Sequence, residues 1–120
     1  MKKIYNKLVR DKMIDIYKHD VENKISASAY SVRYMEKVET LEKLKDKFLE
    51  ESQEMLEVYD KEDTTELQGE LADILEVVDA IMYHKNISRD DVIALRNTKK
   101  EKRGGFEKGL YLESIDYFDK

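Results

Sequence analysis

Two pairs of acidic residues have the types and the spacing of a metal site. Glu51 and Glu54 lie in one strongly helical stretch, Glu70 and Asp73 lie in the next, and a short polar break separates them. Residues three positions apart project from the same side of a helix. Carboxylates that converge from neighbouring helices repel one another unless a cation joins them, and oxygen-only ligands suit Mg²⁺ or Mn²⁺. The spacing therefore predicts that these four acids bind Mg²⁺, with Mn²⁺ as an alternative ion.

The helical phase of the two pairs favours a buried site over a charged surface. Glutamate is common on solvated helix faces, so either pair taken alone fits a surface role. At about 100° per residue, however, Glu70 lies on the same side of its helix as Ile74. Glu51 falls within the arc marked by Leu44, Phe48, Met55 and Val58. The second acid of each pair lies at the edge of its arc. Because a core-facing carboxylate is costly unless something compensates it, we expect both pairs to face inward across a helix hairpin.

Glu50 has two interpretations, which the sequence leaves open. It lies four residues before Glu54, so its side chain can turn toward the ion as an outer ligand or as a general base. The same position is compatible with a solvated helix face.

Two long helices are expected to carry the acids. Apolar residues that recur at steps of three and four predict one helix over about 35–59 and another from about 65 to 84. The second is apolar around much of its circumference. This predicts that it is mostly buried, either at the centre of a bundle or in an oligomer interface.

Shorter elements flank this expected hairpin. A helix is predicted over about 11–19, and a last helix begins with a capping box at 88–91, runs to about 102 and ends at Gly104. The remaining segments have weak or no helical period. We expect a short strand or extended arm over 4–9, an extended segment or loop over 26–34, and a strand or packed arm over 106–115.

The composition narrows the class of protein. A chain of 120 residues with no proline predicts one all-α domain over 1–120, with a small β element as an option where the termini meet. The absence of cysteine excludes disulfides and thiol nucleophiles and fits the cytoplasmic location that we expect. A net charge of −5 argues against stable nucleic-acid binding. No stretch has the pattern of a signal peptide or a membrane span.

The acidic motifs and both ends of the chain resemble a known superfamily. A Lys-x-x-Glu-Glu-x-x-Glu helix, a short break and then Glu-Leu-Ala-Asp is similar to the MazG-like all-α nucleoside triphosphate pyrophosphohydrolases. The motif Tyr-Asn-Lys-Leu-Val-Arg-Asp-Lys at 5–12 and Lys-x-x-x-Arg-Gly-Gly-Phe at 99–106 resemble its phosphoribosyl-ATP pyrophosphohydrolase-like branch. Residues 20–40 match least. The resemblance implies a four- to five-helix bundle.

The resemblance also implies a reaction and roles for the acids. In that superfamily the acids that correspond to Glu51, Glu54, Glu70 and Asp73 bind Mg²⁺ ions that hold a triphosphate. Water attacks the α-phosphorus, which releases pyrophosphate and a nucleoside monophosphate, and the metal provides Lewis acidity, water activation and a template. Either Glu50 or Glu51 accepts the proton of the water.

A triphosphate substrate also needs cations, because charge-assisted hydrogen bonds to phosphate oxygens are strong. Near the end of the last predicted helix, the candidates are Arg96, Lys99, Lys102 and Arg103. Their alternative is a solvated basic helix end that complements the helix dipole. In the opening motif, the cations that can reach the same substrate, including from a neighbouring subunit, are Lys7, Arg10 and Lys12. Their alternative is pairing with Asp11 and the acidic surface.

Several functions remain as alternatives at this point. The first is hydrolysis of a nucleoside triphosphate, including the clearance of non-standard or surplus nucleotides. The others are hydrolysis of phosphoribosyl-ATP, a nucleotide sensor without turnover, and a non-catalytic helical module that binds a partner helix. A homodimer or homotetramer is expected from the resemblance and from the apolar helix predicted from about 65 to 84.

Overall fold

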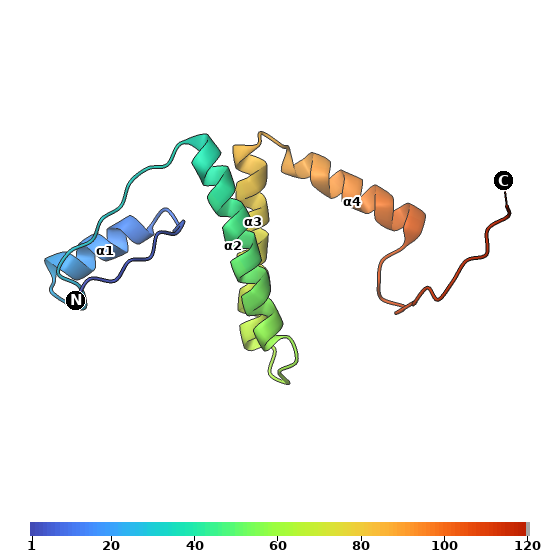
Figure 1. The fold of residues 1–120 in the computed structure, drawn as a ribbon, viewed down its shortest axis with the longest axis horizontal. Coiled ribbons are helices and arrows are strands. Elements are labelled where there is room, and N and C mark those ends of the chain that lie inside the picture. The colour runs from blue at the N-terminus through green and yellow to red at the C-terminus, as the bar shows by residue number, and fades with distance from the viewer. Residues whose placement is uncertain (120) are drawn as a thin grey trace. The chain divides into compact units, whose positions relative to one another are not determined.

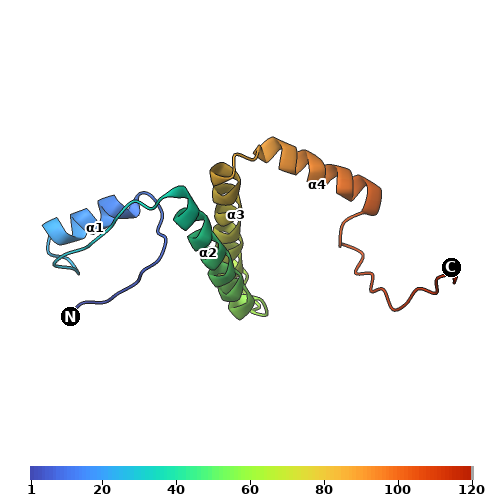
Figure 2. The same ribbon diagram turned by 45° about the horizontal axis from the view of Figure 1, so that its top comes forward.

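A computed structural model describes residues 1–119, which contain four helices and no strand (Figure 1, Figure 2). The all-helical fold class is therefore confirmed. The segments 4–9 and 106–115 have no regular secondary structure, so the strand alternatives are not realised there. The helices are α1 (Met13–Glu22), α2 (Lys37–Val58), α3 (Thr65–His84) and α4 (Arg89–Arg103). The chain divides after Asn86 into two compact units.

An antiparallel hairpin of α2 and α3 forms the centre of the first unit, where the two helices lie side by side (Figure 1, Figure 2). Their bounds agree with the predicted 35–59 and 65–84 to within two residues. The connecting segment ends in a local turn in which the Asp63 carboxylate accepts hydrogen bonds from the backbone nitrogen of Thr65 at 3.0 Å and from its hydroxyl at 2.7 Å. Asp63 thereby satisfies a backbone donor at the start of α3.

The core of this hairpin is small. Leu44 on α2 and Val77 and Met82 on α3 are its buried apolar side chains, and Glu51 is buried with them. The described chain by itself does not bury most of α3, because Leu75 is 62% exposed and Leu71 is also exposed. Burial of α3 in an oligomer interface stays a prediction. Within residues 1–86, α2 is the helix that packs extensively on α3, so one face of α3 is covered there and other apolar positions, such as Leu71 and Leu75, are exposed.

The first unit also contains α1 and irregular segments. The helix predicted over 11–19 begins slightly later, at Met13, because a turn in which the Met13 nitrogen donates to the Arg10 carbonyl at 3.0 Å precedes it. Residues 1–10 form an arm without regular secondary structure, in which Leu8 and Val9 are half-buried. Residues 27–36 are also irregular, which confirms the loop prediction for that region.

The second unit contains α4. Its start is fixed by the predicted capping residue Ser88, whose hydroxyl oxygen accepts a hydrogen bond from the Asp91 nitrogen at 3.3 Å. The helix ends at Arg103 and is followed by Gly104, whose φ of 82° lies in the left-handed region that glycine adopts without strain. Within residues 1–119, none of the helices has both the length and the apolar character needed to cross a membrane.

Candidate functional site

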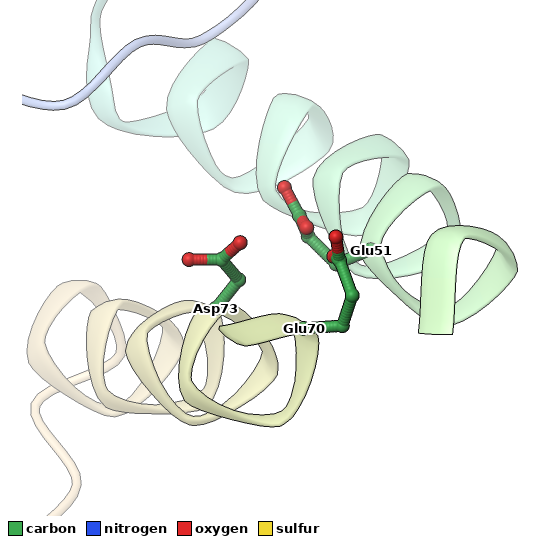
Figure 3. Close-up of side chains that lie close together, drawn as sticks. All are labelled: Glu51, Glu70 and Asp73. Carbon is green, nitrogen blue, oxygen red and sulfur yellow. The ribbon is translucent and has the colours of Figure 1, made fainter. Parts of the chain in front are cut away.

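Three of the four predicted metal ligands meet across the α2–α3 hairpin. Glu51 projects from α2, Glu70 and Asp73 project from α3, and one carboxylate oxygen from each lies within 4.8 Å of those of the other two (Figure 3). Glu70 and Asp73 share a side of α3 because they are one turn apart. Glu51 meets them because its helical phase turns it toward α3. The inward placement predicted from the sequence is therefore what the structure shows for these residues.

The acidic cluster of Glu51, Glu70 and Asp73 has the burial and the unpartnered oxygens that are expected of a cation site. Glu51 is only 6% exposed. The Oε2 atoms of Glu51 and Glu70 are both buried and have no hydrogen-bond partner. Leaving a buried polar group unsatisfied costs about 1–3 kcal/mol, and more if the group is charged. Unpartnered carboxylate oxygens beside a third carboxylate are suitable ligands for a hard divalent cation, so the residues present fit Mg²⁺ or Mn²⁺.

Glu54 lies close enough to this cluster to be perturbed by it. Burial, followed by the negative charges of Glu51 and Glu70, raises the pKa of Glu54 from its ordinary 4.5 to about 7. Burial and the proximity of Glu51 and Asp73 also raise the pKa of Glu70. These shifts show mutual repulsion among carboxylates that share a poorly solvated site. A proton relieves that repulsion, and a bound cation would relieve it more completely.

Lys47 partly neutralises the α2 side of the cluster. Its ammonium nitrogen lies 3.4 Å from Oε1 of Glu51 and 3.5 Å from Oε2 of Glu50. Glu50 is thus turned toward Lys47 and is not among the three acids whose oxygens converge. Sequence reasoning did not select Lys47 as a site residue. The signal was present, because Lys47 precedes Glu51 by four residues and lies on the same helical face.

The predicted phosphate ligands of the N-terminal arm lie beside the hairpin. Arg10 donates from Nη2 to Oδ1 of Asp73 at 2.7 Å, so this guanidinium contacts the acidic cluster directly. The ammonium group of Lys7 lies 5.6 Å from the ring centre of Tyr5. Lys7 also lines a hollow of about 50 Å³ together with Lys47 and others. Through Arg10 the arm therefore brings positive charge to one of the metal-ligand candidates, Asp73.

The other predicted phosphate ligands are exposed residues of α4 in the second unit. Arg96, Lys99 and Arg103 follow one another at steps of three and four and so share a side of that helix, and Lys102 is one turn after Lys99. Arg96 makes a long contact of 3.5 Å to the side-chain oxygen of Asn97. The neighbouring Lys100 pairs with Glu107 at 3.5 Å. The four predicted cations of α4 suit a ligand that carries several phosphate groups.

Comparison with known protein families identifies the chain. The profile of the MazG nucleotide pyrophosphohydrolase domain matches residues 39–105, which is more than half of the sequence. The chain belongs to the MazG nucleotide pyrophosphohydrolase family. The MazG match includes the four acids, Lys47 and the cations of α4, and it excludes the N-terminal arm. Comparison with curated proteins gives no match, and neither does comparison with solved structures.

Proposed function

We propose that this MazG protein hydrolyses a nucleoside triphosphate or a related nucleotide to the monophosphate and pyrophosphate, with Mg²⁺ or Mn²⁺ as cofactor. The observation that carries this proposal is the convergence of Glu51, Glu70 and Asp73, with two buried unpartnered oxygens, inside the MazG match. A divalent ion held there would supply Lewis acidity toward phosphoryl oxygens and lower the pKa of water.

The acids have distinct roles in this proposal. Glu51, Glu70 and Asp73 bind the ion, and Glu54 joins them once it loses its proton. Glu51 is also a candidate to accept the proton of the attacking water. Glu50 suits that role better, because it is more exposed than Glu51 and lies outside the group of converging oxygens. A base must be within hydrogen-bond reach of the water, either directly or through a second water.

The cations bind the phosphates of the substrate in this proposal. In α4 the phosphate ligands are Arg96, Lys99, Lys102 and Arg103, and in the arm they are Lys7 and Arg10. Their support is their positive charge and, for Arg10, its contact with Asp73. We further propose that residues 1–120 work as a single functional domain, because the MazG match runs through the boundary between the two units at Asn86.

We also propose that the protein works as a homodimer or homotetramer in the cytoplasm. The hairpin leaves large apolar side chains on both helices exposed, whereas only three apolar residues of the described chain are buried. The exposed apolar residues of the hairpin include Leu49, Leu56, Leu71 and Leu75. Covering them with a second copy would bury apolar area that the single chain leaves in water. Light scattering of a species at 14.3 kDa would contradict this part of the proposal.

A pyrophosphate-release screen tests the proposed activity. Ribo- and deoxyribonucleoside triphosphates and phosphoribosyl-ATP are each incubated with the protein and Mg²⁺, and a Glu70→Gln variant is run in parallel. We expect Mg²⁺-dependent release from at least one nucleotide, and loss of that release in the variant. Release from phosphoribosyl-ATP alone would identify the related substrate instead. Metal binding without release would indicate a sensor, and neither binding nor release would indicate a non-catalytic module.

A further inference from the structure

The contact between Arg10 and Asp73 joins the N-terminal arm to the acidic cluster. The two side chains are 63 residues apart in sequence, yet Nη2 of Arg10 lies 2.7 Å from Oδ1 of Asp73. Asp73 is one of the three acids whose oxygens converge, and in Figure 3 its carboxylate extends from α3 toward the side of Glu51. The guanidinium therefore lies on a carboxylate that a divalent ion would use.

A guanidinium and a divalent cation compete for such a carboxylate. Two cations held against one small acidic group repel each other at short range, and the repulsion grows as the site loses water. The Arg10 and Asp73 side chains are 61% and 39% exposed, and an exposed ion pair of this kind contributes little to stability. A divalent ion with several carboxylate ligands can therefore displace Arg10 from Asp73.

The arm can release Arg10 without loss of a helix. Residues 1–10 have no regular secondary structure, and Arg10 precedes the first helical residue, Met13. Leu8 and Val9 are half-buried, so the arm can stay packed within the first unit while the Arg10 side chain changes partners. A guanidinium freed at this place would lie next to the ion and to any phosphate that the ion binds, and planar guanidinium groups pair well with phosphate oxygens.

We propose that Arg10 is the internal counter-ion of the acidic cluster. It pairs with Asp73 when the divalent ion is absent, and binding of the ion releases it to pair with a phosphate of the substrate. The inference rests on the proposed function, because it assumes the metal site and a phosphate-bearing substrate. It adds an exchange in which loading of the metal exposes a phosphate ligand.

The test measures binding of Mn²⁺ alone, by electron paramagnetic resonance, to the full chain and to the variant Arg10→Gln. We expect the variant to bind Mn²⁺ roughly three- to tenfold more tightly, since the ion no longer displaces a guanidinium. The matched control is Arg33→Gln. Arg33 also pairs at 2.7 Å with an exposed carboxylate, that of Glu39, and its loss changes the net charge equally. Mn²⁺ affinity should not change in that control.

A double-mutant cycle distinguishes displacement of Arg10 from Asp73 by the ion from a general repulsion between the Arg10 charge and the ion. If Arg10 acts through Asp73, then Arg10→Gln should tighten Mn²⁺ binding in the parent but not in an Asp73→Asn background. An equal gain in both backgrounds would overturn the inference, as would unchanged or weaker binding by Arg10→Gln. Inorganic pyrophosphate provides the second readout. In the presence of Mn²⁺ it should bind several-fold more weakly to Arg10→Gln than to Arg33→Gln, and equal binding would overturn the phosphate half of the exchange.

The failure of this inference is distinguishable from failure of the proposed function. If the parent protein binds Mn²⁺ and releases pyrophosphate but Arg10→Gln has parental Mn²⁺ affinity, only the counter-ion exchange is wrong. If the parent protein binds no Mn²⁺, both proposals fail. Because Arg10 is exposed and lies outside every helix, the variant should fold, and its circular dichroism and melting temperature verify this independently.

Discussion

The ammonium group of Lys47 lies 3.4 Å from Oε1 of Glu51, whereas Oε2 of the same carboxylate is buried and has no hydrogen-bond partner. The negative charge at one oxygen of Glu51 is thus offset by a lysine of the same helix. The other has no partner, although the carboxylates of Glu70 and Asp73 on α3 lie close to Glu51. This division makes Lys47 a positioning residue, because its contact with Oε1 orients the Glu51 carboxylate while Oε2 stays without a partner.

Removal of the Lys47 charge should destabilise the protein when metal is absent. The variant Lys47→Met keeps the apolar stem but leaves buried Glu51 without its cation, which predicts a loss of about 1–3 kcal/mol in the free energy of unfolding. Urea denaturation in EDTA measures this loss. The control is Lys45→Met, which breaks the exposed pair with Glu42 at 2.9 Å and should cost less than about 1 kcal/mol. Equal losses in the two variants would contradict the role given to Lys47.

The stability of the metal-free protein should fall as pH rises toward neutrality. The folded-state pKa of Glu54 is raised to about 7 from an ordinary 4.5, so the folded protein binds more protons than the unfolded chain between these values. Unfolding then releases protons, and the free energy of unfolding decreases as pH rises through this window. The melting temperature in EDTA, measured across it, should show the decrease. Saturating Mn²⁺ should reduce the decrease, because the ion replaces the proton among the carboxylates.

A divalent ion should raise the melting temperature of the parent protein but not that of Glu51→Gln. A ligand at a hundredfold excess over its dissociation constant adds about 2.7 kcal/mol of stability to the folded state. The amide of the variant has nearly the same shape and no charge, so it removes a metal ligand without removing the fold. Glu57→Gln is the matched control, since Glu57 is an exposed residue of the same helix and should leave the Mn²⁺ effect intact. A full Mn²⁺ effect in Glu51→Gln would remove Glu51 from the site.

Loss of the α4 cations should weaken substrate binding more than it slows turnover. The double variant Lys99→Gln/Arg103→Gln removes two proposed phosphate contacts, and at about 1 kcal/mol for each contact the KM should rise by more than tenfold. Lys100→Gln is the control on the same helix, because Lys100 pairs with Glu107 and is not a proposed phosphate ligand. Steady-state kinetics with the best substrate of the screen provides both KM values. An equal KM in the double variant and the control would exclude the α4 contacts.

The sequence predicted the hairpin well because its features are local. The periods of α2 and α3 set their bounds to within two residues, and the same helical phase placed Glu51 and Glu70 on facing sides. The contact of Arg10 with Asp73 was not predictable in this way. It joins an arm without periodicity to a helix 63 residues later, and only tertiary packing brings the two side chains together.

Two further features needed the structure for different reasons. The apolar character of α3 was visible in the sequence, but a hydrophobic pattern does not say which surface covers it, and Leu75 remains exposed in the described chain. The pKa of Glu54 depends on burial and on carboxylates of both helices, so it follows from their separation in space and not from their spacing in sequence.

Hydrolysis in ¹⁸O-labelled water shows directly whether this protein directs water to the α-phosphorus of a nucleotide. The protein is incubated with Mg²⁺ and the best nucleoside triphosphate of the screen. The products are then separated, and their masses are determined by mass spectrometry. We expect the label to enter the nucleoside monophosphate and unlabelled pyrophosphate to be released, because water attacks the α-phosphorus. The Glu70→Gln variant should give neither product. Label in pyrophosphate, formation of nucleoside diphosphate and orthophosphate, or equal turnover by the variant would contradict the proposed reaction at the acidic cluster.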